Sequence, residues 1–67
     1  MEITITRINK ILQKKKISQV EFAKALGLSE SAISRYLSGE RQISIVLLVR
    51  IAKLLEVSAD YLLGIGE

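Results

Sequence analysis

The residues whose types and spacing best suit chemistry form a short polar group, and these are Glu30, Ser31, Ser34 and Arg35. At helical spacing they fall on one side of a helix, whereas Ile33 and Leu37 fall on the other. A guanidinium can donate two parallel hydrogen bonds, a carboxylate accepts them, and a hydroxyl does both. The pattern therefore suits hydrogen-bond recognition of a surface that approaches closely.

Covalent catalysis has little support elsewhere in the 67 residues. The chain contains no cysteine and no histidine, which removes thiolate chemistry, the commonest general base and the commonest metal ligand. No phosphate-loop motif or metal-ligand spacing is present. The acidic residues are scattered: Glu2, Glu21, Glu30, Glu40, Glu56, Asp60 and Glu67. We therefore expect no enzyme, no metal, no cofactor and no small-molecule ligand.

Four apolar-serine pairs predict helix starts, because a serine side chain can cap the free N–H groups of a first turn. The four serines are Ser18, Ser29, Ser44 and Ser58. Ser18 and Glu21 also have the spacing of a capping box, and Gly27, Gly39 and Gly64 can end helices. The predicted helices span about 5–15, 19–26, 30–37, 45–55 and 59–63. Strand-like alternation occurs only in the initial ITIT at positions 3–6.

The stretch Ser18–Gly39, SQVEFAKALGLSESAISRYLSG, has the layout of a helix-turn-helix, with a tight turn at Gly27 and a small Ala23 where the helices approach. From about Thr6 to Gly64 the chain strongly resembles the Cro/C1-type, or Xre-like, family of bacterial and phage regulators. The segments SGER, IAKLLEVS and DYLLG follow in the family's order.

This resemblance implies an all-α, five-helix, lambda-repressor-like bundle that forms one domain over residues 1–67. Its helix-turn-helix lies at about 18–39, in the second and third helices. The implied function is sequence-specific binding of double-stranded DNA. The protein would be a transcriptional repressor that occupies a pseudo-palindromic operator as a homodimer.

The resemblance also assigns site residues. Base reading falls on Glu30, Ser31, Ser34 and Arg35, and Arg35 can pair with guanine O6 and N7. Glu30 either accepts a bond from cytosine N4 or only complements the helix dipole, and both readings stay open. The expected phosphate contacts are Gln19, Ser29, Ser38, Arg41 and Gln42.

The expected dimer interface consists of Leu54, Val57, Ala59, Tyr61 and Leu62. The helix at about 45–55 is apolar almost all round, which predicts burial on more than one face. Its second face either meets a partner or belongs to a larger local core covered by ITIT. The apolar character also favours the alternative function, a protein-interaction module such as an antitoxin or anti-repressor partner.

Two departures from the family pattern carry expectations. An Arg–Glu ion pair of the family is replaced by Leu12 and Leu37, so we expect these two side chains to touch, because paired apolar side chains can replace a buried ion pair. Glu56 stands where the family often has glycine. Since a residue with a Cβ adopts a positive φ only at a cost, we expect this helix to end differently.

Charge and hydropathy indicate partners and location. The net charge is +3, and Arg7, Lys10 and Lys14 to Lys16 cluster before the motif. Such a cluster either faces a polyanion such as DNA or is a solvated helix end favoured by the macrodipole. No apolar run approaches 18 residues and the first residues lack the form of a signal peptide. We therefore expect no membrane contact and a cytoplasmic, nucleoid-associated location.

Overall fold

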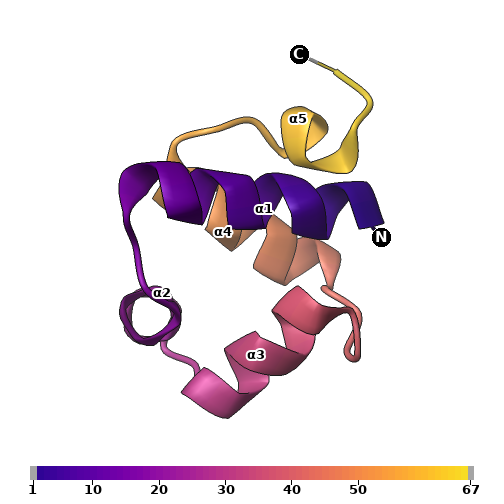
Figure 1. Ribbon diagram of the computed structural model, residues 1–67. Coiled ribbons are helices and arrows are strands. Elements are labelled where there is room, and N and C mark those ends of the chain that lie inside the picture. The colour runs from indigo at the N-terminus through magenta and orange to yellow at the C-terminus, as the bar shows by residue number, and fades with distance from the viewer. Residues whose placement is uncertain (1, 67) are drawn as a thin grey trace.

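The computed structural model describes residues 2–66 and is all-α over that range (Figure 1). The helices are α1 (Glu2–Lys15), α2 (Gln19–Leu26), α3 (Glu30–Ser38), α4 (Ile45–Leu55) and α5 (Ala59–Leu63). α2 packs against α3 and α4, and α1 packs against α3 and α5. In the view of Figure 1, α3 and α5 lie on opposite sides of α1.

The predicted caps of α2, α3, α4 and α5 are confirmed. Each of the four serines is extended and accepts a hydrogen bond from the backbone N–H three residues later. Ser18 and Glu21 form both bonds of the capping box: the Ser18 N–H donates to Glu21 Oε1 at 2.9 Å, and the Glu21 N–H donates to Ser18 Oγ at 3.1 Å. These starts depend on residues within one turn, so the sequence alone determines them.

The first helix begins earlier than the sequence pattern predicts. ITIT is helical, because α1 starts at Glu2. The side chains of Thr4, Ile8 and Leu12, spaced by four residues, are buried along one stripe. The alternation of apolar residues at 3 and 5 fits a strand over four residues. Burial of this longer stripe outweighs the local alternation.

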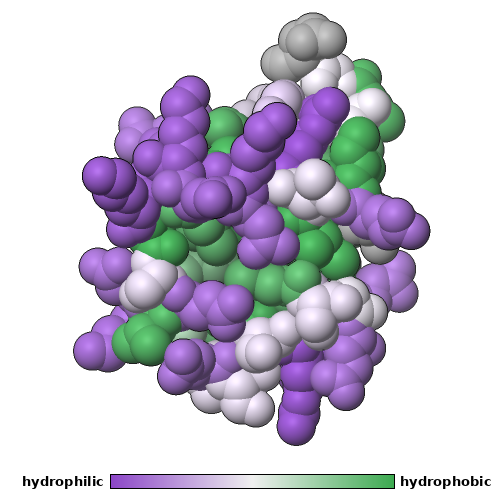
Figure 2. Space-filling model, in the orientation of Figure 1, coloured by the Kyte–Doolittle hydropathy of each residue, from purple (hydrophilic) through white to green (hydrophobic). Residues whose placement is uncertain are grey.

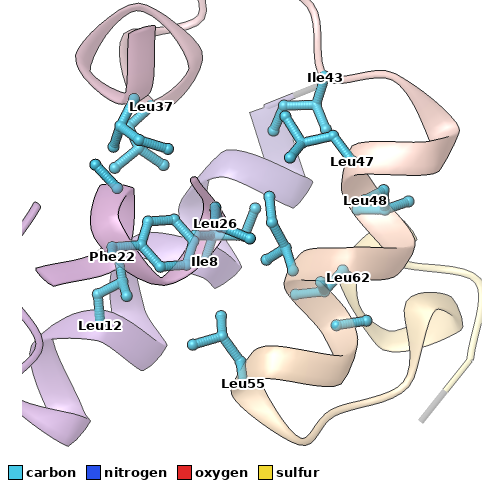
Figure 3. Close-up of a cluster of buried hydrophobic side chains, with 14 residues drawn as sticks. Ile8, Leu12, Phe22, Leu26, Leu37, Ile43, Leu47, Leu48, Leu55 and Leu62 are labelled. Carbon is cyan, nitrogen blue, oxygen red and sulfur yellow. The ribbon is translucent and has the colours of Figure 1, made fainter. Parts of the chain in front are cut away.

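One core joins all five helices, as Figure 3 shows for its largest members. The buried apolar residues are Ile8, Leu12, Phe22, Ala23, Leu26, Ile33, Leu37, Ile43, Leu47, Leu48, Ile51, Ala52, Leu55 and Leu62. Val20, which the helical pattern places in the core, is instead exposed on the outer side of α2. Phe22, the largest side chain of the cluster, is completely buried.

The predicted contact between Leu12 and Leu37 is wrong. Both are buried in the same cluster, but they lie apart in Figure 3, with the ring of Phe22 between them in that view. An arginine and a glutamate could reach each other across such a gap because both side chains are long. Two leucines are shorter, so each packs into the common core separately.

The expectation that Glu56 changes the end of α4 is also wrong. Glu56 adopts the left-handed conformation at φ 59°, as a glycine would, and the Val57 N–H donates to the Ala52 carbonyl at 3.0 Å. The flanking Leu55 is buried and Val57 packs on the core. Tertiary packing therefore imposes the helix end despite the local steric cost of the Cβ.

The outer face of α4 is not covered by the ITIT segment, which was one of the two alternatives for this helix. Leu47 enters the core, but Ile45, Val46, Val49 and Leu54 are exposed. ITIT does not enlarge the core over this face, because the first turn of α1 packs on the end of α5. There Ile3 Cδ1 lies 2.8 Å from the position that a Cβ on Gly64 would occupy, and Gly64 has φ 77°. A glycine is favoured at this C-cap by its positive φ, and a Cβ there would also displace the end of the Ile3 side chain.

Candidate nucleic-acid interface

The helix α3 presents the polar edge that the sequence predicts. Ile33 and Leu37 are buried and Tyr36 is half-buried. The four candidate base-reading residues are all exposed: Glu30, Ser31, Ser34 and Arg35. The helix is thus anchored from behind by apolar side chains, and its outward edge carries short polar groups beside one guanidinium.

Local hydrogen bonds fix both ends of α3. At the start, Ser29 Oγ accepts from the Ala32 N–H at 3.1 Å. At the end, Gly39 adopts the left-handed conformation, and the Arg41 N–H donates to the Arg35 carbonyl at 3.1 Å. The edge is therefore presented by a helix whose first and last turns are both held by hydrogen bonds.

The two arginines near this edge differ in their surroundings. Within residues 2–66 the Arg35 guanidinium has no hydrogen bond, ion pair or ring contact, so all its donors face solvent. Arg41 instead places its guanidinium carbon 5.2 Å from the centre of the Tyr36 ring. This cation–π contact orients Arg41 along α3, and the sequence analysis missed it. The only signal was an aromatic residue followed by an arginine five positions later.

The expected phosphate-contacting residues lie at the ends of the motif helices. Gln19 is the exposed first residue of α2, and Ser29 caps α3. Arg41 and Gln42 are exposed in the connection to α4, where they line a small pocket with Ile5, Gly39 and Ile43. Ser38 is less available, because its hydroxyl donates to the Arg35 carbonyl at 3.1 Å and accepts from the Glu40 N–H at 3.4 Å.

The expected dimer residues differ in their exposure. Leu62 has no exposed area and belongs to the core of the single chain, so its assignment to an interface is wrong. Leu54 is exposed on α4, and Ala59 is half-buried at the start of α5. Val57 and Tyr61 line a groove beside α1 instead. The period of a five-residue helix could not separate its buried side from its open side.

The lysine cluster lies mainly on α1. Lys14 and Lys15 occupy the last turn of α1, where positive charge complements the helix dipole. Lys10, Lys14 and Lys15 line the groove that contains Val57 and Tyr61. In Figure 2 hydrophilic side chains crowd over α1, and white and purple side chains cover the region of α3. The lysines of α1 and Arg35 of α3 therefore belong to different elements.

The family comparison agrees with this geometry. Residues 8–62 match the model of the HTH_3 helix-turn-helix family. The matched segment covers most of the chain and includes α2, α3 and α4. The chain belongs to the HTH_3 helix-turn-helix family. Comparison with curated proteins and with solved structures gives no match.

Membership of the HTH_3 family implies DNA binding and a non-enzymatic protein. It also confirms the expected resemblance to Cro/C1-type regulators, and the five-helix arrangement is consistent with a lambda-repressor-like fold. Among residues 2–66 no helix is both long and apolar enough to cross a bilayer. The same residues contain no group of three or more metal-ligating side chains.

Proposed function

We propose that this HTH_3 protein is a transcriptional repressor that binds one operator sequence in double-stranded DNA. The exposed polar edge of α3 supports this proposal most directly. Ser31 and Ser34 are short enough to let the helix backbone approach base edges in a major groove about 12 Å wide. Occupancy of a promoter is sufficient to block polymerase, so repression requires no further active group. Such a ligand would place the protein in the cytoplasm, at the nucleoid.

Each polar residue of the edge has a chemical role in this proposal. Arg35 pairs with guanine O6 and N7, and among residues 2–66 its guanidinium has no competing partner. Glu30 accepts a bond from cytosine N4, or it only stabilises the first turn of α3. Gln19, Ser29, Arg41 and Gln42 contact phosphates on either side of the reading edge, and Ser38 does so only by giving up a bond within the chain.

We further propose that two copies pair through the outer face of α4. Val46 is 73% exposed and Ile45 is 66% exposed, and Val49 is exposed one turn after Ile45. Leu54 is exposed near the end of α4, and Ala59 is half-buried at the start of α5. Because only residues 39–44 separate α3 from α4, pairing here would place two copies of α3 in a fixed relation. Half-sites one helical turn apart, about 34–36 Å, are then read together.

Selection of bound duplexes from a random pool tests the proposal. We expect one enriched motif with two-fold symmetry, with half-sites about one turn apart. Affinity for that motif should fall steeply as salt rises, since bound phosphates release counterions. The absence of any enriched sequence would overturn the proposal and favour the protein-interaction module. An enriched motif without symmetry would overturn only the pairing of two copies.

A further inference from the structure

A groove on the far side of α1 from α3 has no role in the proposed DNA contact. It has a volume of about 620 Å³ and lies between α1 and the connection from α4 to α5. The lining residues are Lys10, Ile11, Lys14, Lys15, Leu55, Glu56, Val57 and Tyr61. This volume is comparable to that of clefts that hold a small organic ligand, so the groove can seat a few side chains.

The groove combines an apolar floor with a positive rim. Ile11, Val57 and Tyr61 are half-buried and pack on the core from its edge. Three lysines line the same groove against one carboxylate, that of Glu56. A ligand that matches both features must carry negative charge as well as apolar side chains.

The α5 wall of the groove is firmly held. The Arg7 guanidinium lies 4.3 Å from the centre of the Tyr61 ring and also donates a hydrogen bond to the Tyr61 carbonyl. These two contacts fasten α5 to α1. The groove therefore exists before any ligand arrives, which lowers the entropic cost of binding.

Two other occupants fit less well. A duplex seated on α3 lies across the molecule from this groove, and a phosphate backbone has no apolar group to cover Ile11 and Val57. A second copy paired here by a two-fold axis would bring two copies of the lysine rim into one interface, each with only the Glu56 carboxylate to offset it. This excess of positive charge opposes association.

We infer that this groove is a docking site for an acidic segment of a partner protein, one that carries apolar side chains among its carboxylates. The carboxylates pair with Lys10, Lys14 and Lys15, and an apolar side chain covers the floor. Because the groove is remote from α3, the segment binds whether or not DNA is bound. This inference does not depend on the proposed repressor function.

A titration of the isotope-labelled full chain, followed by amide chemical shifts, tests the inference. The probe is a short capped peptide of Asp and Glu residues with a central Leu-Phe pair. Two comparison peptides replace either Leu-Phe by Ser-Ser or every acid by its amide. We expect shifts at Ile11, Val57 and Tyr61 but not at Ser31 or Ser34, and about tenfold weaker binding of each comparison peptide.

Charge reversal provides the matched control. The double variant Lys10→Glu and Lys14→Glu should weaken binding of the acidic peptide by about tenfold or more. Lys53→Glu, which changes an exposed lysine on α4, should leave it unchanged. All three lysines are exposed, so a circular-dichroism spectrum like that of the parent is expected for both proteins.

Several results would overturn the inference. If the Ser-Ser peptide bound as tightly as the Leu-Phe peptide, the apolar floor would make no contribution and the site would be only a diffuse basic surface. Shifts at the groove amides caused equally by a short random-sequence duplex would assign the groove to nucleic acid. Sedimentation that shows a dimer of the free chain, together with amide shifts at Ile11, Val57 and Tyr61 as that chain is concentrated, would assign the groove to a second copy. Since operator DNA enters none of these measurements, they are independent of the outcome of the duplex selection.

Discussion

At the scale of single residues, two arginine side chains matter most for the proposed DNA contact. Arg35 carries an exposed guanidinium that has no partner in the described part of the chain, and it lies on an edge of short side chains. Arg41 is already oriented over Tyr36, so it loses less side-chain freedom when it meets a phosphate. This contrast suits Arg35 to reading a base and Arg41 to positioning the helix.

Arg35→Ala should lower affinity for the selected operator by about 1–3 kcal/mol, because a bidentate contact to guanine is lost. Selectivity should relax at one base position per half-site. Titrations of the operator and of its single-base variants measure both effects. Lys15→Ala serves as the control, since this exposed lysine lies in the last turn of α1. An equal loss on every sequence would make Arg35 a phosphate contact.

Glu56 holds a left-handed conformation at φ 59° that a residue with a Cβ reaches only at a cost. Glu56→Gly should therefore raise the free energy of unfolding by about 1 kcal/mol. The thermal midpoint of so small a domain should rise by about 4–8 °C. Glu56→Ala keeps the Cβ and should show no such gain. If both variants gain equally, removal of the carboxylate rather than of strain is responsible.

At the scale of helices, each short element depends on hydrogen bonds at its ends. α2 has a complete capping box, and α3 has a serine cap at its start and a left-handed glycine after its end. A helix of eight or nine residues is marginal in isolation. These caps and the buried side of each helix therefore stabilise the motif together.

The capping box predicts a pH dependence. Hydrogen bonds from the Ser18 backbone and then the Ser18 side chain hold the pKa of Glu21 below its ordinary value. The ionised carboxylate thus stabilises the fold above the ordinary pKa, and this contribution is lost as pH falls through the lowered value. Glu21→Gln keeps an acceptor at the same place but cannot titrate.

Urea unfolding of the chain and of Glu21→Gln across acidic pH measures this contribution. We expect the parent to lose more stability than the variant between neutral and acidic pH. Parallel curves for the two proteins would show that the capping box does not contribute to the acid sensitivity.

At the scale of the whole molecule, three surfaces surround one core. These are the polar edge of α3, the exposed apolar face of α4 and the lysine-rimmed groove between α1 and α5. The polar edge and the groove lie on opposite sides of α1 in Figure 1, so a substitution on one should leave the other intact.

Val46→Glu tests the proposed pairing face. Val46 is 73% exposed, so the single chain should fold normally. A buried unpaired carboxylate in the interface should weaken dimerisation by about tenfold or more. Sedimentation measures dimerisation, and binding to a single half-site should be unchanged. Ile65→Glu is the control, since Ile65 is also 73% exposed but lies beyond α5. Equal dimerisation of both variants would contradict the proposed face.

The sequence alone determined the features that depend on neighbours within one turn. The four serine caps, the left-handed glycines and the division of α3 into an anchored side and a polar edge follow from local hydrogen bonds and helical period. Only the tertiary structure decided which apolar surface is covered. In the folded chain α1 begins at Glu2, Leu62 is buried, Val46 is exposed and a groove lies beside Lys14. Burial is a sum over segments distant in the chain, so no local pattern specifies it.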